Sequence, residues 1–313
     1  MNICFFTEMD FSGKIPRDHV NMRTEFAWMA VLNAEHRSLF NASIENWDLG
    51  IIIIPKKRVD LLISSDYISQ IKKQCKKVAV MQEGPQWLWQ DLPIQQQIWY
   101  LNVLSDMDFL LVHNESDIKY FKGLTHKPCY NLPSLMITDQ LTMHNIKKQN
   151  SVIIGGNMCS WYSGLDSYIV ALQFGISIDI PSMGRRKENE ERLDNLNHLP
   201  YMNWKDWMVN LSQYKYAVHL MRTHAAGTMA LNCAYWGIPC IGYKGLDTQE
   251  KLHTETAVEL GDLESAKKIV AFLKDPEFYE SCSNFSRSSY NELYTEASFI
   301  KHVNSIFKNE DLL

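Results

Sequence analysis

The pattern with the clearest chemical meaning lies at residues 222–242, RTHAAGTMALNCAYWGIPCIG. The small residues at 225–227 would form a turn in which the backbone can approach a ligand, and Thr228 begins a helical pattern. Free backbone N–H groups at the start of a helix bind phosphate well, and Arg222, just before the turn, could add a positive charge. The stretch therefore predicts a diphosphate-binding turn. The alternative is that its glycines only cap a packed helix.

Further candidates for ligand binding follow other apolar runs of the second half. A glycine turn lets a phosphate approach the backbone, a guanidinium can bind a diphosphate through two parallel hydrogen bonds, and polar side chains at a strand end can bind sugar hydroxyls. These candidates are Gly155, Gly156, Asn157, Arg185, Asp247 and Gln249. Two of them have an equally good structural interpretation: Arg185 as a surface residue beside a charged run, and Asp247 as the cap of the next helix.

Glu83 is the strongest candidate for a general base. It follows an apolar run and precedes a Gly-Pro pair, with Trp87 and Trp89 close by in sequence. A carboxylate at a strand end can accept a proton, and the tryptophans could stack on a sugar or a base. The alternative is a turn glutamate beside core tryptophans. Asp10, which follows the first apolar run, is the second candidate base.

The elements that must position these residues alternate along the chain, as parallel strands and connecting helices do. A length of 313 residues favours two cores over one. We therefore expect an α/β fold of two Rossmann-like domains facing a central cleft, with ligands beyond the carboxyl ends of the strands. Strands are expected at 2–7, 49–55, 77–82, 109–113 and 128–132, and then at 151–154, 176–180, 216–220, 238–242 and 257–258.

Helices are expected between these strands. The clearest are at 19–34, at 92–104, from Glu115, at 163–174, from Trp204, from Gly227 and at 263–273. Between them, a polar stretch without periodicity predicts a linker. The expected organisation is a first domain at 1–136, the linker at 137–150, a second domain at 151–275 and C-terminal helices at 276–313.

The composition is that of a folded protein without a strong charge: 46% of the residues are hydrophobic, 21% are charged, and the net charge is −5. The first 150 residues hold equal numbers of basic and acidic residues, which argues against broad electrostatic capture of nucleic acid. Residues 56–58 and the lysines of 72–77 could still form a local basic strip, or simply a solvated surface.

Location and redox state follow from what the sequence lacks. It has neither a signal-like start nor an apolar run near the roughly 18 residues of a membrane span, so we expect a cytoplasmic protein without a span. The seven cysteines are scattered and include no C-x-x-C pair, so we expect them to be reduced.

The two-domain plan and residues 222–242 resemble the nucleotide-sugar domain of GT-B fold glycosyltransferases, in which a glycine-rich turn and helix precede a Gly-x-Pro strand. In many retaining members two glutamates stand eight positions apart across this turn. His224 and Asn232 occupy the matching positions here, a departure that leaves the stereochemistry open. The donor-binding residues that the resemblance and the strand-end loops imply are Gly155, Gly156, Asn157, Arg185, Arg222, His224, Ala226, Gly227, Thr228, Asn232, Asp247 and Gln249.

The resemblance implies transfer of a sugar from a nucleoside diphosphate sugar, with a UDP-sugar favoured, to an acceptor hydroxyl. The second domain would hold the donor, and the first would bring the acceptor and the base, Glu83 or Asp10. No metal and no other cofactor is expected, because GT-B transferases generally do without one.

The acceptor has two candidates. The chain resembles phage-encoded glycosyltransferases, several of which modify hydroxymethylated bases of their own DNA, and this would place it in the host cytoplasm. A cell-surface glycan is the other candidate. A nucleotide-sugar epimerase of the same fold is a second enzyme hypothesis. We do not expect a periplasmic binding protein, because the sequence shows no export signal, nor an NAD-dependent enzyme, because no G-x-G-x-x-G motif follows the first strand of either domain.

Overall fold

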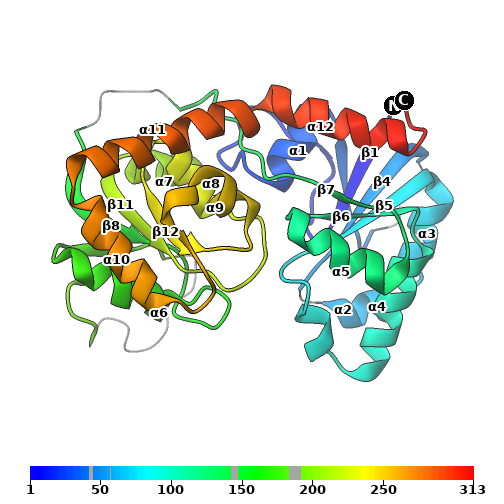
Figure 1. The fold of residues 1–313 in the computed structure, drawn as a ribbon. Helices are drawn as coiled ribbons and strands as arrows, with labels where there is room; N and C mark the ends of the chain where they lie inside the picture. Colours follow the sequence, from blue (N-terminus) through cyan, green and yellow to red (C-terminus); the bar gives the residue numbers. More distant parts are fainter. Residues whose placement is uncertain (42–44, 57, 142–146, 183–191) are drawn as a thin grey trace.

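The computed structural model describes residues 1–41, 45–56, 58–141, 147–182 and 192–313. It consists of two α/β halves, each with a mainly parallel sheet covered by helices (Figure 1). The prediction of an α/β fold with two Rossmann-like domains is therefore confirmed.

The first sheet has, among the described residues, seven strands in the order β2-β3-β1-β4-β5-β6-β7, parallel except for β2. Its strands are β1 (Ile3–Thr7), β2 (Gly13–Lys14), β3 (Glu35–Ser38), β4 (Trp47–Ile54), β5 (Cys75–Gln82), β6 (Phe109–Val112) and β7 (Cys129–Asn131). Its helices are α1 (Glu25–Val31), α2 (Val59–Ile63), α3 (Tyr67–Gln74), α4 (Ile94–Asp106) and α5 (Glu115–Thr125).

The second sheet has six parallel strands within the described ranges, in the order β10-β9-β8-β11-β12-β13. Its strands are β8 (Gln149–Ile154), β9 (Ile178–Ile180), β10 (Leu196–His198), β11 (Tyr214–His219), β12 (Cys240–Tyr243) and β13 (Ala257–Val258). Its helices are α6 (Gly164–Ala171), α7 (Trp204–Leu211), α8 (Thr228–Tyr235), α9 (Asp247–Leu252), α10 (Leu263–Leu273) and α11 (Pro276–Leu293).

Burial explains why the strands read as unbroken apolar runs. All five residues of β1 are buried, as are the four isoleucines that end β4. A parallel sheet with helices on both faces buries both sides of each strand, so the sequence need not alternate. Loops that follow the carboxyl ends of strands in both sheets line one cavity between the halves.

The chain returns to the first half at its end. Helix α11 packs against α8 and α9, and α12 (Glu296–Asn309) then crosses to the first half (Figure 1). There His302 Nε2 lies 2.8 Å from Asn131 O, and Tyr130 donates to Glu310 Oε1 at 2.7 Å. No helix in the described part of the chain has the length and apolar character that crossing a bilayer requires.

The expected helix at 19–34 is wrong in its first part. Only α1 is helical, because residues 22–24 instead run alongside residues 135–137: Thr24 N–H donates to Leu135 O at 2.8 Å and Ile137 N–H to Met22 O at 2.9 Å. The strands β2, β3 and β10 were not predicted, since β2 has only two residues and β3 and β10 are short and mostly polar. Five residues of the expected linker, 142–146, lie outside the described residues.

Candidate functional site

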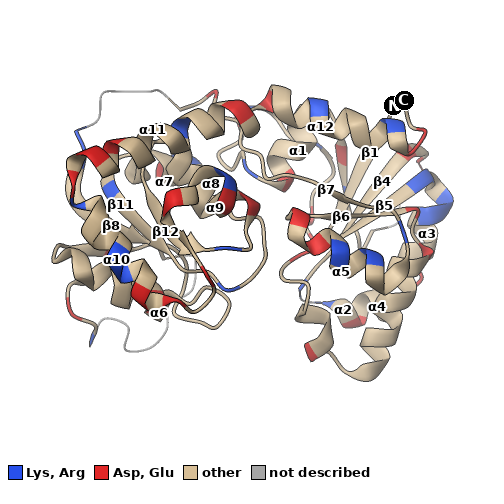
Figure 2. Cartoon of the chain, in the orientation of Figure 1, with Lys and Arg blue, Asp and Glu red and all other residues tan. Residues whose placement is uncertain are grey.

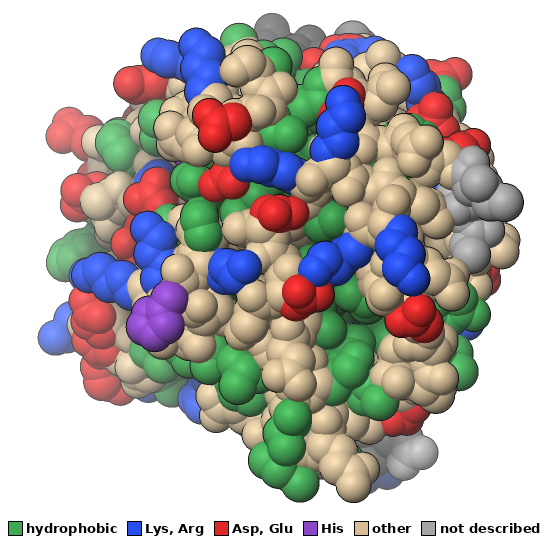
Figure 3. Space-filling model, turned by 90° about the vertical axis from the view of Figure 1, so that its right-hand side faces the viewer, with side chains coloured by type: hydrophobic (Ala, Val, Ile, Leu, Met, Phe, Trp, Pro, Cys, Tyr) green, Lys and Arg blue, Asp and Glu red, His purple; other side chains and the backbone are tan. Residues whose placement is uncertain are grey.

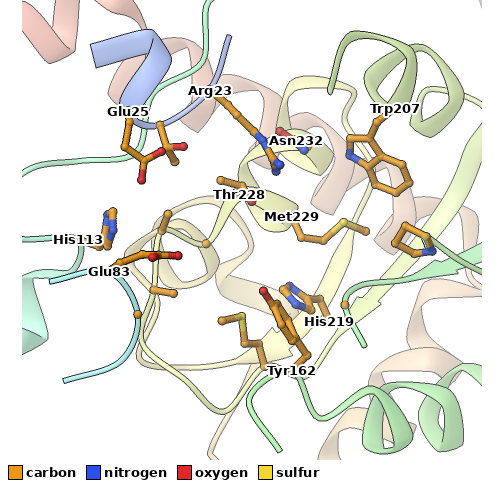
Figure 4. Close-up of a pocket in the computed structure, with 18 of the residues that line it drawn as sticks. Arg23, Glu25, Glu83, His113, Tyr162, Trp207, His219, Thr228, Met229 and Asn232 are labelled. Carbon is orange, nitrogen blue, oxygen red and sulfur yellow. The ribbon is translucent and has the colours of Figure 1, made fainter. Parts of the chain in front are cut away.

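A cavity of about 230 Å³ lies between the two halves, where the carboxyl ends of the sheets meet (Figure 4). Each half supplies one wall. Arg23, Glu25, Glu83 and His113 come from the first, whereas Tyr162, His219 and the start of α8 come from the second. Six residues that the sequence singled out line this cavity together: Glu83, Gly156, Ala226, Gly227, Thr228 and Asn232.

Gly227 gives the predicted turn its shape. Its φ of 62° lies in the left-handed region, and an added Cβ would overlap Thr248 Oγ1. Thr248 in turn donates to Gly227 O at 2.9 Å, which fixes the backbone just before α8 begins. The first turn of α8 thereby presents its N–H groups at the edge of the cavity, and a helix N-terminus favours anionic groups.

The two peptides before Gly227 are anchored from the other side of the cleft. Asn114 Nδ2 donates to Ala225 O at 3.1 Å, and the hydroxyl of Ser134 donates to Ala226 O. In a trans peptide the N–H points away from the carbonyl, and the structure has no cis peptide in its described residues. The N–H groups of Ala226 and Gly227 therefore point away from these anchors, and no described group accepts from them.

Asn232 lies behind the turn and is only 2% exposed. With the amide oriented to satisfy both of its groups, its nitrogen donates to Thr228 O at 3.2 Å and its oxygen accepts from Trp207 Nε1 at 3.1 Å. The Asn232 side chain thus holds the first turn of α8 and the indole of α7 together at the cavity wall.

Two histidines of the cavity keep an unpartnered ring nitrogen. His219, at the end of β11, is 6% exposed and its Nε2 has no hydrogen-bond partner among the described residues; burial lowers its pKa to about 4. On the opposite wall, Nδ1 of His113 is likewise unpartnered, and burial lowers the pKa of that imidazole. A neutral imidazole can donate or accept a hydrogen bond, so both rings suit a polar ligand.

Two positively charged side chains, Lys56 and Arg23, line the cavity. Lys56 Nζ pairs with Glu83 Oε1 at 3.0 Å and lies 5.0 Å from the ring centroid of Trp161, across the cleft. Arg23 is partly buried and donates to Asn21 Oδ1 at 3.1 Å, but no carboxylate in the described part of the chain forms an ion pair with it. In Figure 4 its guanidinium points toward Thr228 and Asn232, so this positive charge is directed at the start of α8.

A second chamber of about 500 Å³ adjoins the first and shares Arg23, Pro181 and Trp207 with it. More than half of its lining residues are apolar, and they include Tyr201, which is 74% exposed, and Trp204. Such a wall suits the face of a planar ring.

Several other predicted residues lie outside the cavity lining. Arg222 has 53% of its side chain exposed and pairs with Asp166 at 3.0 Å. Gln249 is 2% exposed and donates to Cys240 O at 2.8 Å, so its amide is used within the second half. Asp10 is exposed to solvent.

The two glycines of the turn after β8 have different neighbours. Gly156 lines the cavity, whereas Gly155 faces the ring of His219, where an added Cβ would clash. Asn157 is buried, and its carbonyl accepts from Gly164 N–H at 3.2 Å. Arg185 lies outside the described residues.

His224 and Asp247 contact the first half of the chain instead of the cavity. Nδ1 of His224 lies 2.8 Å from Asp117 Oδ1, and this bond raises the pKa of the imidazole. The Asp247 carboxylate accepts from Glu115 N–H at 3.1 Å, and burial raises its pKa. Both residues therefore sit in the interface beside the predicted turn.

No three His, Cys, Asp or Glu side chains gather into a metal-binding group among the described residues. The aspartates Asp106 and Asp108 precede β6 at its amino end, where they bind Lys72 Nζ and Val78 N–H at 2.5 and 2.6 Å. They thus lie at the edge of the sheet opposite to the cavity. The expectation of a metal-independent reaction stays a prediction.

The fold, unlike the sequence, has clear relatives. No family model matches the chain, and no curated protein matches it in sequence. HepE from Anabaena, solved with UDP and glucose, matches with a TM-score of 0.68 and 8% identity over 99% of this chain and 100% of its own. An alpha-glucosyltransferase solved with UDP-glucose and DNA containing an abasic site matches at 0.62 and 13% over 98% and 99%.

A third match is sucrose-phosphate synthase from Thermosynechococcus elongatus, with a TM-score of 0.63 and 13% identity over 84% of this chain and 73% of its own. All three are two-domain GT-B structures. This chain has the GT-B fold. The cavity described above lies in the cleft between the two GT-B domains, and the predicted resemblance in fold is confirmed.

Sequence reasoning missed Arg23, Lys56, His219 and Trp207 as residues of the GT-B cleft. His219 ends an expected strand, so the rule that ligands bind at carboxyl ends could have found it. Arg23 fell within an expected helix, and that error hid it. Lys56 directly follows the expected strand at 49–55, so the rule that applies to His219 could have found it as well. Trp207 gave no signal in the sequence, because only the packing of its helix brings it to the cavity.

Proposed function

We propose that this protein is a glycosyltransferase that moves a sugar from a nucleoside diphosphate sugar, with a UDP-sugar favoured, to an acceptor hydroxyl. The observation that carries this proposal is the cavity with one wall from each domain. One wall offers free N–H groups at Ala226, Gly227 and the start of α8, and the other offers carboxylates and an imidazole. A donor and an acceptor held on facing walls would meet in this space.

The diphosphate fits beside the turn at 225–227, with Arg23 as its cation. A leaving diphosphate gains negative charge in the transition state, and preorganised N–H donors and a guanidinium stabilise such charge without a metal. The second chamber, which shares Arg23 with the first and is lined by Tyr201, would take the nucleobase. Arg222, which the sequence also suggested, lies outside the cavity lining and would act at the rim. Arg185 stays a candidate from the sequence alone.

Glu83 is our choice for the general base. It lines the cavity from the acceptor-side domain, and Lys56 fixes its carboxylate. Glu25 lies on the same wall and is the next candidate by position. Asp10, the other candidate from the sequence, is exposed and is not among the residues that line the cavity. His219, on the donor wall, suits a sugar hydroxyl.

Different observations favour each of two candidate acceptors. DNA with a hydroxymethylated base is one candidate, because an alpha-glucosyltransferase of the same fold was solved with DNA. A glycan is the other, because the predicted basic strip is largely neutralised by acidic partners: Lys56 pairs with Glu83, Lys72 with Asp106, Lys76 with Asp48 and Lys77 with Glu310. Figure 2 shows basic and acidic residues along the ribbon of the first domain, and the face seen in Figure 3 has basic and acidic side chains interspersed rather than a continuous basic surface.

Calorimetric titration with UDP, GDP and their sugar conjugates tests the donor half of the proposal. Tight binding of one nucleotide supports it, and binding of none contradicts it. The acceptor half is tested by adding hydroxymethylated DNA, plain DNA or a glycan panel and following the mass of each acceptor. If the protein isomerised or hydrolysed the nucleotide-sugar when no acceptor was present, the result would instead support the epimerase hypothesis.

A further inference from the structure

The N-terminus of α5, on the first domain, is capped in an unusual way. Asn114 is its N-cap residue, and asparagine is among the best N-caps, yet its side chain makes no capping bond to its own helix. Instead Asn114 Nδ2 reaches across the cleft to Ala225 O, and its Oδ1 accepts from Asp247 N–H at 3.0 Å. The Asp247 carboxylate accepts from Glu115 N–H in return. Helices α5 and α9 thus exchange caps between domains.

A second bond of the same interface reaches the residue before the turn. Asp117 is 5% exposed, and its carboxylate binds His224 Nδ1 at 2.8 Å. The charged groups that raise the pKa of His224 are Asp117 on α5 and Asp247 and Glu250 on α9. Because all three are acidic, protonation of His224 strengthens the contact.

We propose that Asn114 and Asp117 are positioning residues that set the backbone of residues 224–227, so that this donor-binding turn is complete only when the first domain holds it. The proposal rests on the function proposed above for that turn. We call the contacts of Asn114 and Asp117 with residues 224, 225 and 247 the interdomain clasp.

The geometry explains how the clasp would act on a ligand that it does not touch. Asn114 holds the carbonyl of Ala225 toward the first domain, so the N–H of Ala226 in the same peptide points away from that domain. Ser134 holds the carbonyl of Ala226, so the N–H of Gly227 likewise points away. If the clasp opens, the peptide between residues 225 and 226 loses the bond that orients it. Donor affinity would then depend on the orientation of the two domains.

Variants can separate this role from simple loss of stability. Asn114→Asp keeps an oxygen for Asp247 N–H and a good N-cap, but removes the donor to Ala225 O and to Asp117 Oδ2. Asp117→Ala removes the partner of His224, whereas Asp117→Asn keeps an oxygen at the same place. Lys251→Met is the matched control, since Lys251 bridges the same interface to Glu115 at 2.6 Å and pairs with Asp247 at 3.3 Å, but has no recorded bond to Asn114, Asp117 or the turn.

We expect Asn114→Asp and Asp117→Ala to weaken UDP binding about tenfold, the size of one lost buried hydrogen bond. They should raise the donor KM more than they lower kcat. Asp117→Asn should restore part of the affinity, and Lys251→Met should bind UDP within about twofold of the unmodified protein. Hydrogen exchange of peptides covering 223–235, measured without nucleotide, should become faster in the first two variants only.

Two results would overturn the proposal: unchanged affinity and exchange in Asn114→Asp, or equal losses in Lys251→Met. If the unmodified protein bound no nucleotide, the proposed function would fail, and the exchange measurement would still decide whether the clasp orders the turn. Thermal midpoints of all variants identify any that fail to fold, and for Asn114 the variant Asn114→Ser, which keeps an N-cap, then replaces Asn114→Asp.

Discussion

Lys56 binds both oxygens of Glu83: its Nζ lies 3.0 Å from Oε1, and its backbone N–H donates to Oε2 at 3.3 Å. The same Nζ lies over the ring of Trp161 on the other domain. One residue thus fixes the direction of the carboxylate and connects it to the donor side of the cleft. Glu83 also follows β5 directly, so a buried strand holds its backbone.

Replacing Glu83 by glutamine tests its role as the base. The change keeps the shape and one oxygen but removes the proton-accepting carboxylate, so we expect the transfer rate to fall by about 10²–10⁴. UDP affinity should stay within about twofold, because Glu83 stands on the acceptor wall. The measurements are steady-state transfer and calorimetry on the same preparation. A transfer rate near that of the unmodified protein would move the base to Glu25.

The two arginines make different predictions for nucleotide binding. Arg23 points into the cavity without a carboxylate partner, so Arg23→Gln should weaken UDP binding by about 10–100-fold, as expected for a lost hydrogen bond to a charged group. Arg222 is half exposed and already paired with Asp166, so Arg222→Ala should weaken binding less. Calorimetry with UDP ranks them. A larger loss in Arg222→Ala would place the diphosphate at the rim and not beside Arg23.

The sequence was sufficient for the architecture because apolar runs mark buried parallel strands directly. The isoleucines of β4 and the Gly-x-Pro run before β12 needed no knowledge of distant contacts. It failed where long-range pairing decides the backbone. Residues 22–24 pair with residues 135–137, more than a hundred positions away, and no local pattern announces that.

In the candidate site, too, the sequence indicated residues with a local signal and missed arrangements that depend on the tertiary fold. The turn at 225–227 and Glu83 were found because small residues and a strand-end carboxylate are local signals. Asp247 had two interpretations from the sequence, a ligand to hydroxyls or a helix cap. The structure shows its carboxylate at the N-terminus of α5 on the other domain, a third arrangement that only the tertiary fold creates.

The dependence of stability on pH should have two limbs. Burial lowers the pKa of His36, His219 and His253 to about 4, below the 6.5 of an unfolded histidine. The unfolded chain therefore binds more protons between about pH 4 and 6.5, and stability should be lost on acidification through that range, by on the order of 1–3 kcal/mol per histidine.

His224 has the opposite sign. Asp117 raises its pKa, so its contribution is complete below the pKa of the unfolded state and is lost as the pH rises through the higher folded value. Urea unfolding across pH 5–8 should give a maximum between the two limbs. In His224→Gln the alkaline decline should flatten while the acid limb stays. An unchanged alkaline limb would show that the His224–Asp117 bond adds no stability.

Gly227 offers a test of the turn itself. Alanine there would hold a left-handed backbone at φ 62° and would also push its Cβ into Thr248 Oγ1, which is buried and bound to Gly227 O. Gly175 is the matched control, since its φ of 68° is similar but an added Cβ meets nothing within 4 Å.

Gly175→Ala should therefore cost only the backbone strain, about 1 kcal/mol, whereas Gly227→Ala should cost more than about 2 kcal/mol and also weaken UDP binding. Urea unfolding gives the free energies, and titration at a temperature where both variants are folded gives the affinities. If Gly227→Ala were as stable as Gly175→Ala, the contact with Thr248 would not fix the turn. If it also kept its UDP affinity, the N–H groups of residues 226 and 227 would not be the groups that bind the diphosphate.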